Sequence, residues 1–139
     1  MFINGTDIYT TYGVTPVKGT NSALFEIVVP KAPITTDIDT LDGESVYFQA
    51  TPPVRARSFT MPVALVADDS ADFFTKKTAF ETLLGSGLFA ITSNKFPQVF
   101  RCYLEECQQY SQLTPVTSSK MAALIHLKLR EINPKNRTV

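Results

Sequence analysis

Residues 55–66, RARSFTMPVALV, alternate between two kinds of side chain. One set lies at every second position and is mainly large and apolar: Arg55, Arg57, Phe59, Met61, Val63 and Leu65. Because successive side chains of a strand point to opposite faces, this alternation predicts a long strand with one apolar face. Pro62 has no N–H to donate, so this part of the strand is expected at a sheet edge or a bulge. An uncovered edge would invite a partner chain.

A second alternating stretch lies near the C-terminus and predicts another half-buried strand. Its apolar face consists of Met121, Ala123, Ile125, Leu127 and Leu129. Residues 99–107 predict a neighbouring strand, and the polar connection at 108–120, which contains Pro115, predicts a long loop. Shorter strands are expected at 7–12, 23–29, 46–50 and 88–91. Seventeen threonines and fifteen aromatic residues agree with a sheet-rich chain.

Helical periodicity occurs at residues 70–84, where Phe73, Phe80, Leu83 and Leu84 share one face. Ser70 is suited to begin this helix and Gly85 to end it. The predicted fold is mainly β, a β-sandwich-like domain with one packed α-helix at about residues 70–84. A chain of 139 residues suits one domain, so residues 1–139 are expected to form a single module.

Charge and hydropathy exclude several classes of partner. Thirteen basic residues balance thirteen acidic residues, which disfavours nucleic acid and anionic membranes as main partners. The longest apolar stretch, residues 61–67, is much shorter than the ~20 residues of a membrane-spanning helix. The N-terminal residues lack the basic and apolar regions of a secretory signal, so synthesis in the cytoplasm is expected.

Catalytic machinery is not indicated by the sequence. The only histidine, His126, lies on the polar face of a predicted strand, where a solvated or interface role is expected. Glu105 and Glu106 are adjacent in a strand and are expected on opposite faces, which disfavours a glycosidase pair. We therefore expect no enzyme activity and no catalytic residue.

Cofactor and metal motifs are not indicated either. Cys102 and Cys107 are an odd number of positions apart, so we expect them on opposite faces of one strand, as free thiols. Asp37, Asp39 and Asp42 resemble an acidic calcium loop, but the glycine and glutamate of such a loop would fall at positions occupied by Asp42 and Phe48. An ordinary turn with Asp-Gly at its tip is the preferred interpretation.

Residues 30–45, PKAPITTDIDTLDGES, are the longest segment without strong periodicity and form either a surface loop or a projecting arm. Ile34, Ile38 and Leu41 would lie exposed on such a segment. Burying them between subunits would remove apolar surface from water. Together with Pro62, these three residues are the candidate oligomer interface.

Several segments, taken in order, resemble the N-terminal domain of the distal tail proteins of long-tailed bacteriophages, the siphophage tail component family. They are FINGTDIYTTYGV at residues 2–14, the Asp42-Gly43 turn, ARSFTMPVALV at 56–66, AFETLLGSGLFAITSNKFPQVFRCYLEEC at 79–107 and MAALIHLKLREINP at 121–134. The resemblance lies in the order and spacing of these segments.

The resemblance implies a structural tail protein of a virion or prophage that forms a hexameric ring linking the tail tube to the tail tip or baseplate. Its expected partners are copies of itself and other tail proteins, and its expected location is the virion tail tip. A tail tube or tail-completion protein is a related alternative. A small carbohydrate-binding β-sandwich is an alternative of another class. The lack of tryptophan disfavours it, because sugar sites usually display exposed aromatic rings.

Overall fold

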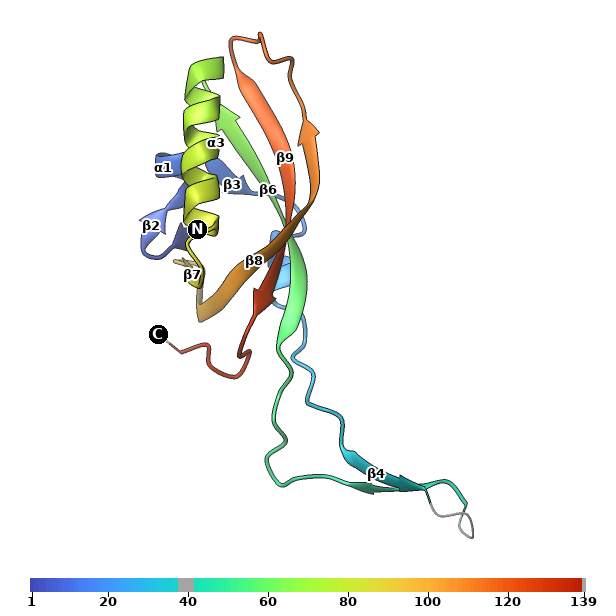
Figure 1. Ribbon diagram of the computed structural model, residues 1–139. Helices are drawn as coiled ribbons and strands as arrows, with labels where there is room; N and C mark the ends of the chain where they lie inside the picture. The colour runs from blue at the N-terminus through green and yellow to red at the C-terminus, as the bar shows by residue number, and fades with distance from the viewer. Residues whose placement is uncertain (38–41, 139) are drawn as a thin grey trace.

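The computed structural model describes residues 1–37 and 42–138, and Figure 1 shows an elongated body from which one arm projects. In chain order the elements are β1 (Phe2–Ile3), β2 (Thr6–Asp7), α1 (Ile8–Tyr12), β3 (Val14–Pro16), α2 (Thr20–Leu24), β4 (Ile34–Asp37), β5 (Glu44–Tyr47), β6 (Arg57–Ala67), α3 (Ser70–Leu84), β7 (Phe89–Ser93), β8 (Phe96–Gln112) and β9 (Met121–Glu131). Seven strands form the antiparallel sheet of the body, in the order β2-β1-β7-β8-β9-β6-β3. Strands β4 and β5 pair only with each other.

The two strands predicted with most detail lie side by side in the sheet, between β8 and β3. β6 pairs with β9 without interruption from Arg57 opposite Glu131 to Ala67 opposite Met121. Opposed side chains of an antiparallel pair share a face, so the two apolar sets combine into one. That shared face is buried: Phe59, Met61, Val63, Leu65, Met121, Ala123, Ile125, Leu127 and Leu129.

Helix α3 lies along this apolar face (Figure 1). It buries Phe73, Phe80 and Leu84 in the same core, and full burial of such a side chain stabilises the fold by about 1.5–3 kcal/mol. The mainly β, sandwich-like fold with one helix packed at residues 70–84 is therefore confirmed. The cap lies one residue earlier than predicted, at Asp69 instead of Ser70, because the Asp69 carboxylate accepts the Asp72 N–H at 2.7 Å.

The predicted strands at 7–12 and 23–29 are wrong, since α1 and α2 occupy part of each range. The Asp7 carboxylate caps α1 by accepting the Tyr9 N–H at 3.2 Å. Gly13 ends that helix with φ 66°, a left-handed conformation that favours glycine. Local capping thus overrides the β propensity of the aromatic and branched side chains in this segment.

Strand β8 is longer than the predicted strand at 99–107, so its connection to β9 is 113–120 rather than 108–120. The register with β9 shifts at two places in β8, between Leu104 and Glu106 and between Cys107 and Gln109. A bulge of this kind inserts one residue and changes which side chains face the core.

The first bulge places the two cysteines on the same face, so the prediction of opposite faces is wrong. Cys102 lies opposite Glu131 and Cys107 opposite Leu127, and these β9 partners share the core side. The five-residue separation still spans about 16 Å of strand, too far for a bridge. Both thiols are free, Cys102 buried and Cys107 exposed.

Candidate assembly surface

The arm comprises residues 32–54 and leaves one end of the body (Figure 1). At its base, Pro30 is bridged to Val54, and the Lys31 N–H donates to the Pro53 carbonyl at 2.8 Å. Farther out, β4 and β5 pair from Ile34 opposite Tyr47 to Asp37 opposite Glu44. The expected strand at 46–50 therefore belongs in part to this hairpin and not to the body. An isolated two-stranded hairpin is at best marginally stable in water, which favours a role in contact with a partner.

Large apolar side chains lie exposed on this hairpin. Ile34 is 64% exposed, Tyr47 63% and Phe48 68%. A hollow of about 250 Å³ lies among them and the prolines at the arm base. The structure thus brings Ile34, one of the four candidate interface residues, together with two aromatic residues of the strand expected at 46–50. Ile38 and Leu41 lie outside the described residues.

Pro62, the fourth candidate, lies within β6 opposite His126. β3 pairs with β6 only at residues 63–65, so Pro62 has β9 alone as its strand neighbour. This agrees with the expected position at a sheet edge, but the edge is covered. The Thr20 hydroxyl of α2 donates to the Pro62 carbonyl at 2.7 Å. A direct role of Pro62 in a subunit interface stays a prediction.

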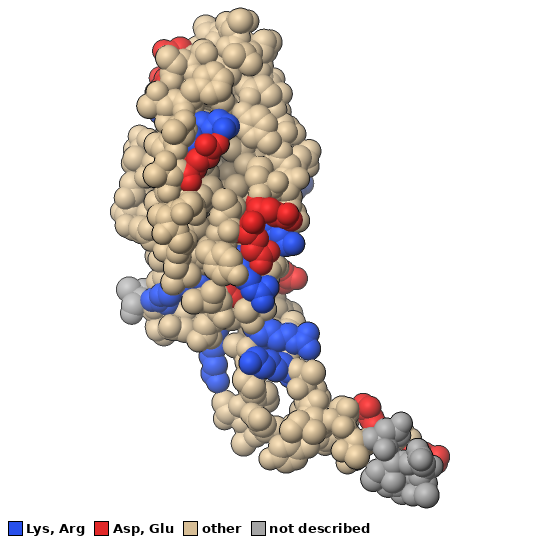
Figure 2. All heavy atoms as spheres, in the orientation of Figure 1, with Lys and Arg blue, Asp and Glu red and all other residues tan. Residues whose placement is uncertain are grey.

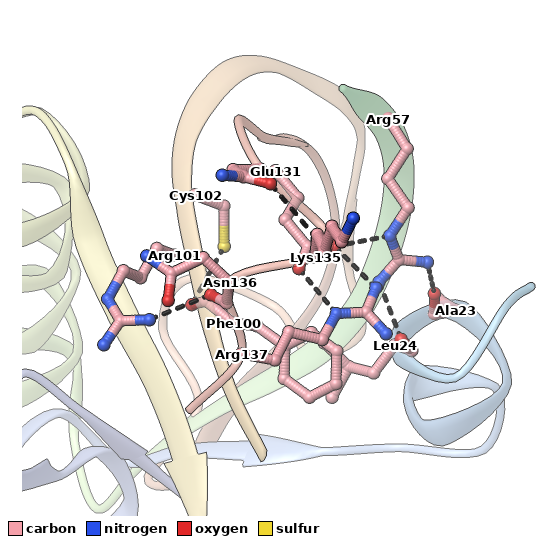
Figure 3. Close-up of polar contacts among 11 residues, drawn as sticks. Ala23, Leu24, Arg57, Phe100, Arg101, Cys102, Glu131, Lys135, Asn136 and Arg137 are labelled. Carbon is pink, nitrogen blue, oxygen red and sulfur yellow. Dashed lines mark hydrogen bonds and ion pairs between the residues drawn. The ribbon is translucent and has the colours of Figure 1, made fainter. Parts of the chain in front are cut away.

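A buried ion triad holds the end of the body from which the arm leaves (Figure 3). The Glu131 carboxylate is 1% exposed and accepts from Arg57 Nε at 2.6 Å and from Arg137 Nε at 2.8 Å. The Arg57 guanidinium stacks 4.6 Å from the Phe59 ring centroid, and that of Arg137 lies 4.7 Å from the Phe100 centroid. The two arginines therefore pair, stack and shield the one carboxylate.

Burial acts to raise the pKa of Glu131, but hydrogen bonds from Arg137 and Arg57, with their charges, outweigh it and hold the pKa below its ordinary value. Burial also raises the pKa of the adjacent Cys102 thiol, to about 12, with the Glu131 charge as the next cause. Cys102 is thus a protonated core side chain near neutral pH.

The triad and the nearby Arg101 also tie together segments that are distant in the chain. Arg57 donates to the Ala23 carbonyl at 3.0 Å and to the Leu24 carbonyl at 2.6 Å, at the end of α2. Arg101 donates to the carbonyls of Asn136 and Thr138 at 2.9 and 3.0 Å, which fastens the C-terminal segment against β8. Because Arg57 follows the arm base by two residues, these contacts fix where the arm leaves the body.

Periodicity alone did not predict this triad, although the sequence contains charged residues at core-facing positions. Arg57 falls on the same strand face as Phe59, and Glu131 continues the apolar face that starts at Met121. Opposite charges at core-facing positions of two long strands predict a buried pair once the strands are aligned. The register that aligns them became known only with the structure.

A second apolar surface lies between α3 and the distal half of β8. It is a groove of about 630 Å³ with Phe74, Phe80, Leu104, Cys107, Tyr110 and Val116 among its lining residues. β7 pairs with β8 no farther than Cys102, so within the described residues the distal half of β8 has β9 as its only strand neighbour. The two bulges interrupt that edge, which disfavours simple strand addition.

The polar residues considered for chemistry lie on the outer face of the sheet or outside any cluster. Glu105 and Glu106 both reach Lys128, at 3.8 and 3.6 Å, so their expected placement on opposite faces is wrong because of the bulge between them. His126 lies between Pro62 and Gln109 in the register of the neighbouring strands. Asp39 of the acidic segment lies outside the described residues.

Neither a metal-binding cluster nor a membrane-spanning helix is present in the described part of the chain. Within residues 1–37 and 42–138, no group of three or more His, Cys, Asp or Glu side chains is placed to hold a metal ion. No helix in the same ranges is long and apolar enough to cross a membrane.

The body and arm together define a β-sandwich-like domain with one long packed helix and a projecting hairpin. No protein-family model matches the sequence, and no curated protein is similar to it. The fold is similar to the crystal structure of the Dit protein of phage SPP1, described as a paradigm of the hub adsorption apparatus in phages that infect Gram-positive bacteria. The TM-score is 0.51 at 12% sequence identity, over 91% of this chain and 47% of that protein. The chain thus spans about half the length of the SPP1 protein, and the likeness is one of fold.

Proposed function

We propose that this chain is a structural protein of a phage tail that assembles into a ring, hexameric by the family resemblance, between the tail tube and the tail tip or baseplate. Two independent lines support the proposal: the ordered sequence segments that resemble distal tail proteins, and the fold similarity to a phage hub adsorption protein. Under this proposal the chain is made in the host cytoplasm, and its partners are copies of itself and other tail proteins.

The observation that carries the proposal is the arm. Ile34, Tyr47 and Phe48 are each about two-thirds exposed, and the arm that carries them projects from the body (Figure 1). Moving the exposed part of each side chain out of water would contribute about 1–2 kcal/mol, at about 25 cal/mol per Å² of apolar surface. A rotationally repeated contact in which each arm meets the next subunit is heterologous, and such contacts form a ring when the rotation closes.

The test replaces Ile34, Tyr47 and Phe48 by serine and measures mass in solution by light scattering and particle shape by electron microscopy. The wild-type chain is expected to form closed rings, and the triple variant is expected to stay folded but to dissociate. Summed over three side chains, a loss of about 3–6 kcal/mol corresponds to roughly a 100-fold to 10,000-fold weaker contact.

A matched control replaces three exposed apolar residues of the body, Tyr9, Leu88 and Leu113, which are 62%, 53% and 60% exposed. This control is expected to assemble like the wild type. Open filaments in place of rings would support the tail tube alternative. A wild-type chain that stays monomeric at high concentration would contradict the proposal.

A further inference from the structure

The chain has no net charge, but its negative and positive charges are unevenly distributed between the arm and the body. The 23 residues from Ala32 to Val54 contain four carboxylates, Asp37, Asp39, Asp42 and Glu44, and no lysine or arginine, a net charge of −4. Since the whole chain has thirteen basic and thirteen acidic residues, the remainder has thirteen basic and nine acidic residues, a net charge of +4. The arm and the rest of the chain are therefore electrostatically complementary.

The positive charge gathers at the end of the body from which the arm leaves (Figure 2). Lys31 and Arg55 flank the arm base. Arg57 and Arg137 surround the single Glu131 carboxylate, and Arg101 holds the C-terminal segment that carries Lys135. We name this set of six residues, Lys31, Arg55, Arg57, Arg101, Lys135 and Arg137, the basic end.

The acidic tip does not neutralise the basic end of its own subunit. An extended strand rises about 3.3 Å per residue, so the segment from Lys31 to Asp37 spans up to about 20 Å, and Asp37 lies opposite Glu44 at the end of the β4–β5 pairing. Charges in water are screened beyond a Debye length of about 8 Å at physiological ionic strength. Asp42 and Glu44 are exposed, and the arm points away from the body. The acidic residues of the arm are therefore accessible to a different molecule that carries complementary charge.

We propose that the acidic outer arm of one subunit binds the basic end of the body of the next copy of this chain. The proposal rests on the ring assembly proposed above and specifies the polarity of its contact. Arm-to-arm and body-to-body contacts bring like charges together, whereas arm-to-body contacts bring opposite charges together. Electrostatics thus selects the head-to-tail contact that a ring needs, and the apolar side chains of the arm supply the buried area.

The experiment reverses charge on each side separately and then on both. The tip variant carries Asp42→Lys and Glu44→Lys. The body variant carries Arg55→Glu and Lys135→Glu, two exposed residues without an ion pair among the described residues. A matched control carries Asp68→Lys and Glu106→Lys on the body, which changes net charge by the same amount as the tip variant. Assembly is measured by sedimentation velocity at NaCl concentrations from about 0.05 M to about 0.5 M.

Each single-sided variant is expected to weaken assembly about 10-fold or more at low salt, and the combined variant is expected to regain it. Wild-type assembly is expected to weaken as salt rises, and the control is expected to assemble like the wild type. Rings that are insensitive to salt and to both reversals would overturn this inference and leave the ring proposal standing. A combined variant that fails to regain assembly, although folded by circular dichroism, would also overturn it. A wild-type monomer at low salt would overturn both proposals.

Discussion

Replacing Glu131 by glutamine should destabilise the body strongly, because it removes the one carboxylate that Arg57 and Arg137 share. Glu131 is 1% exposed, and the side chains of the two arginines are 11% and 13% exposed. Removing one partner of such a buried pair lowers the free energy of unfolding by about 3–5 kcal/mol, because the remaining charge stays buried without compensation. For a domain of this size that loss corresponds to a Tm lower by about 10–20 °C. Thermal and urea unfolding followed by circular dichroism measure it.

The pH dependence of the same variant tests the cause. The pKa of Glu131 is lower in the folded chain than its ordinary value of 4.5, so the ionised carboxylate stabilises the fold at neutral pH. That stabilisation is complete above the pKa of the unfolded chain and is lost as pH falls through the folded pKa. The difference between wild type and Glu131→Gln should therefore be largest at neutral pH and shrink in acid below the ordinary pKa.

An exposed carboxylate provides the matched control. Glu105 pairs with Lys128 and Arg130 on the outer face at 3.8 and 3.6 Å. Glu105→Gln should cost at most about 1 kcal/mol, as is usual for exposed ion pairs. Equal losses of stability in the two variants would refute the proposed role of the triad in stabilising this end of the body. A Glu131→Gln loss that is the same at neutral and acidic pH would also refute it.

Two further predictions concern the thiols and the long helix. In the native chain, a thiol reagent at neutral pH should label Cys107 quickly and Cys102 only upon unfolding, because Cys102 is buried with its pKa raised to about 12; equal native rates would contradict this. Asp69→Ala should lower the free energy of unfolding by about 1 kcal/mol, because the Asp69 carboxylate caps α3. Ser70→Ala should change that free energy little. A larger loss for Ser70→Ala than for Asp69→Ala in urea unfolding would show that Ser70 is the cap.

The parts of the fold that the sequence predicted are those in which one periodicity dominates. β6 and β9 alternate without interruption, so their faces were assigned correctly from Phe59 onward. The faces of β8 were wrong beyond Leu104, because a bulge adds one residue and leaves no mark in a pattern of residue types. The two short helices were missed because a cap such as Asp7 or Gly13 decides a five-residue helix, whereas propensity is summed over longer windows.

The arm shows why the candidate interface was predicted only in part. Alternation and composition indicate that a strand is apolar, but they do not indicate which molecule buries it, so Tyr47 and Phe48 of the strand expected at 46–50 were not included in the candidate interface. Charge carries the missing information. Four acidic residues and no basic residue lie between Ala32 and Val54. If this segment were a strand of the basic body, folding would bring its carboxylates close to basic residues. Under the ring assembly proposed above, the basic end of the next copy is a surface of opposite charge that can cover this apolar, acidic hairpin.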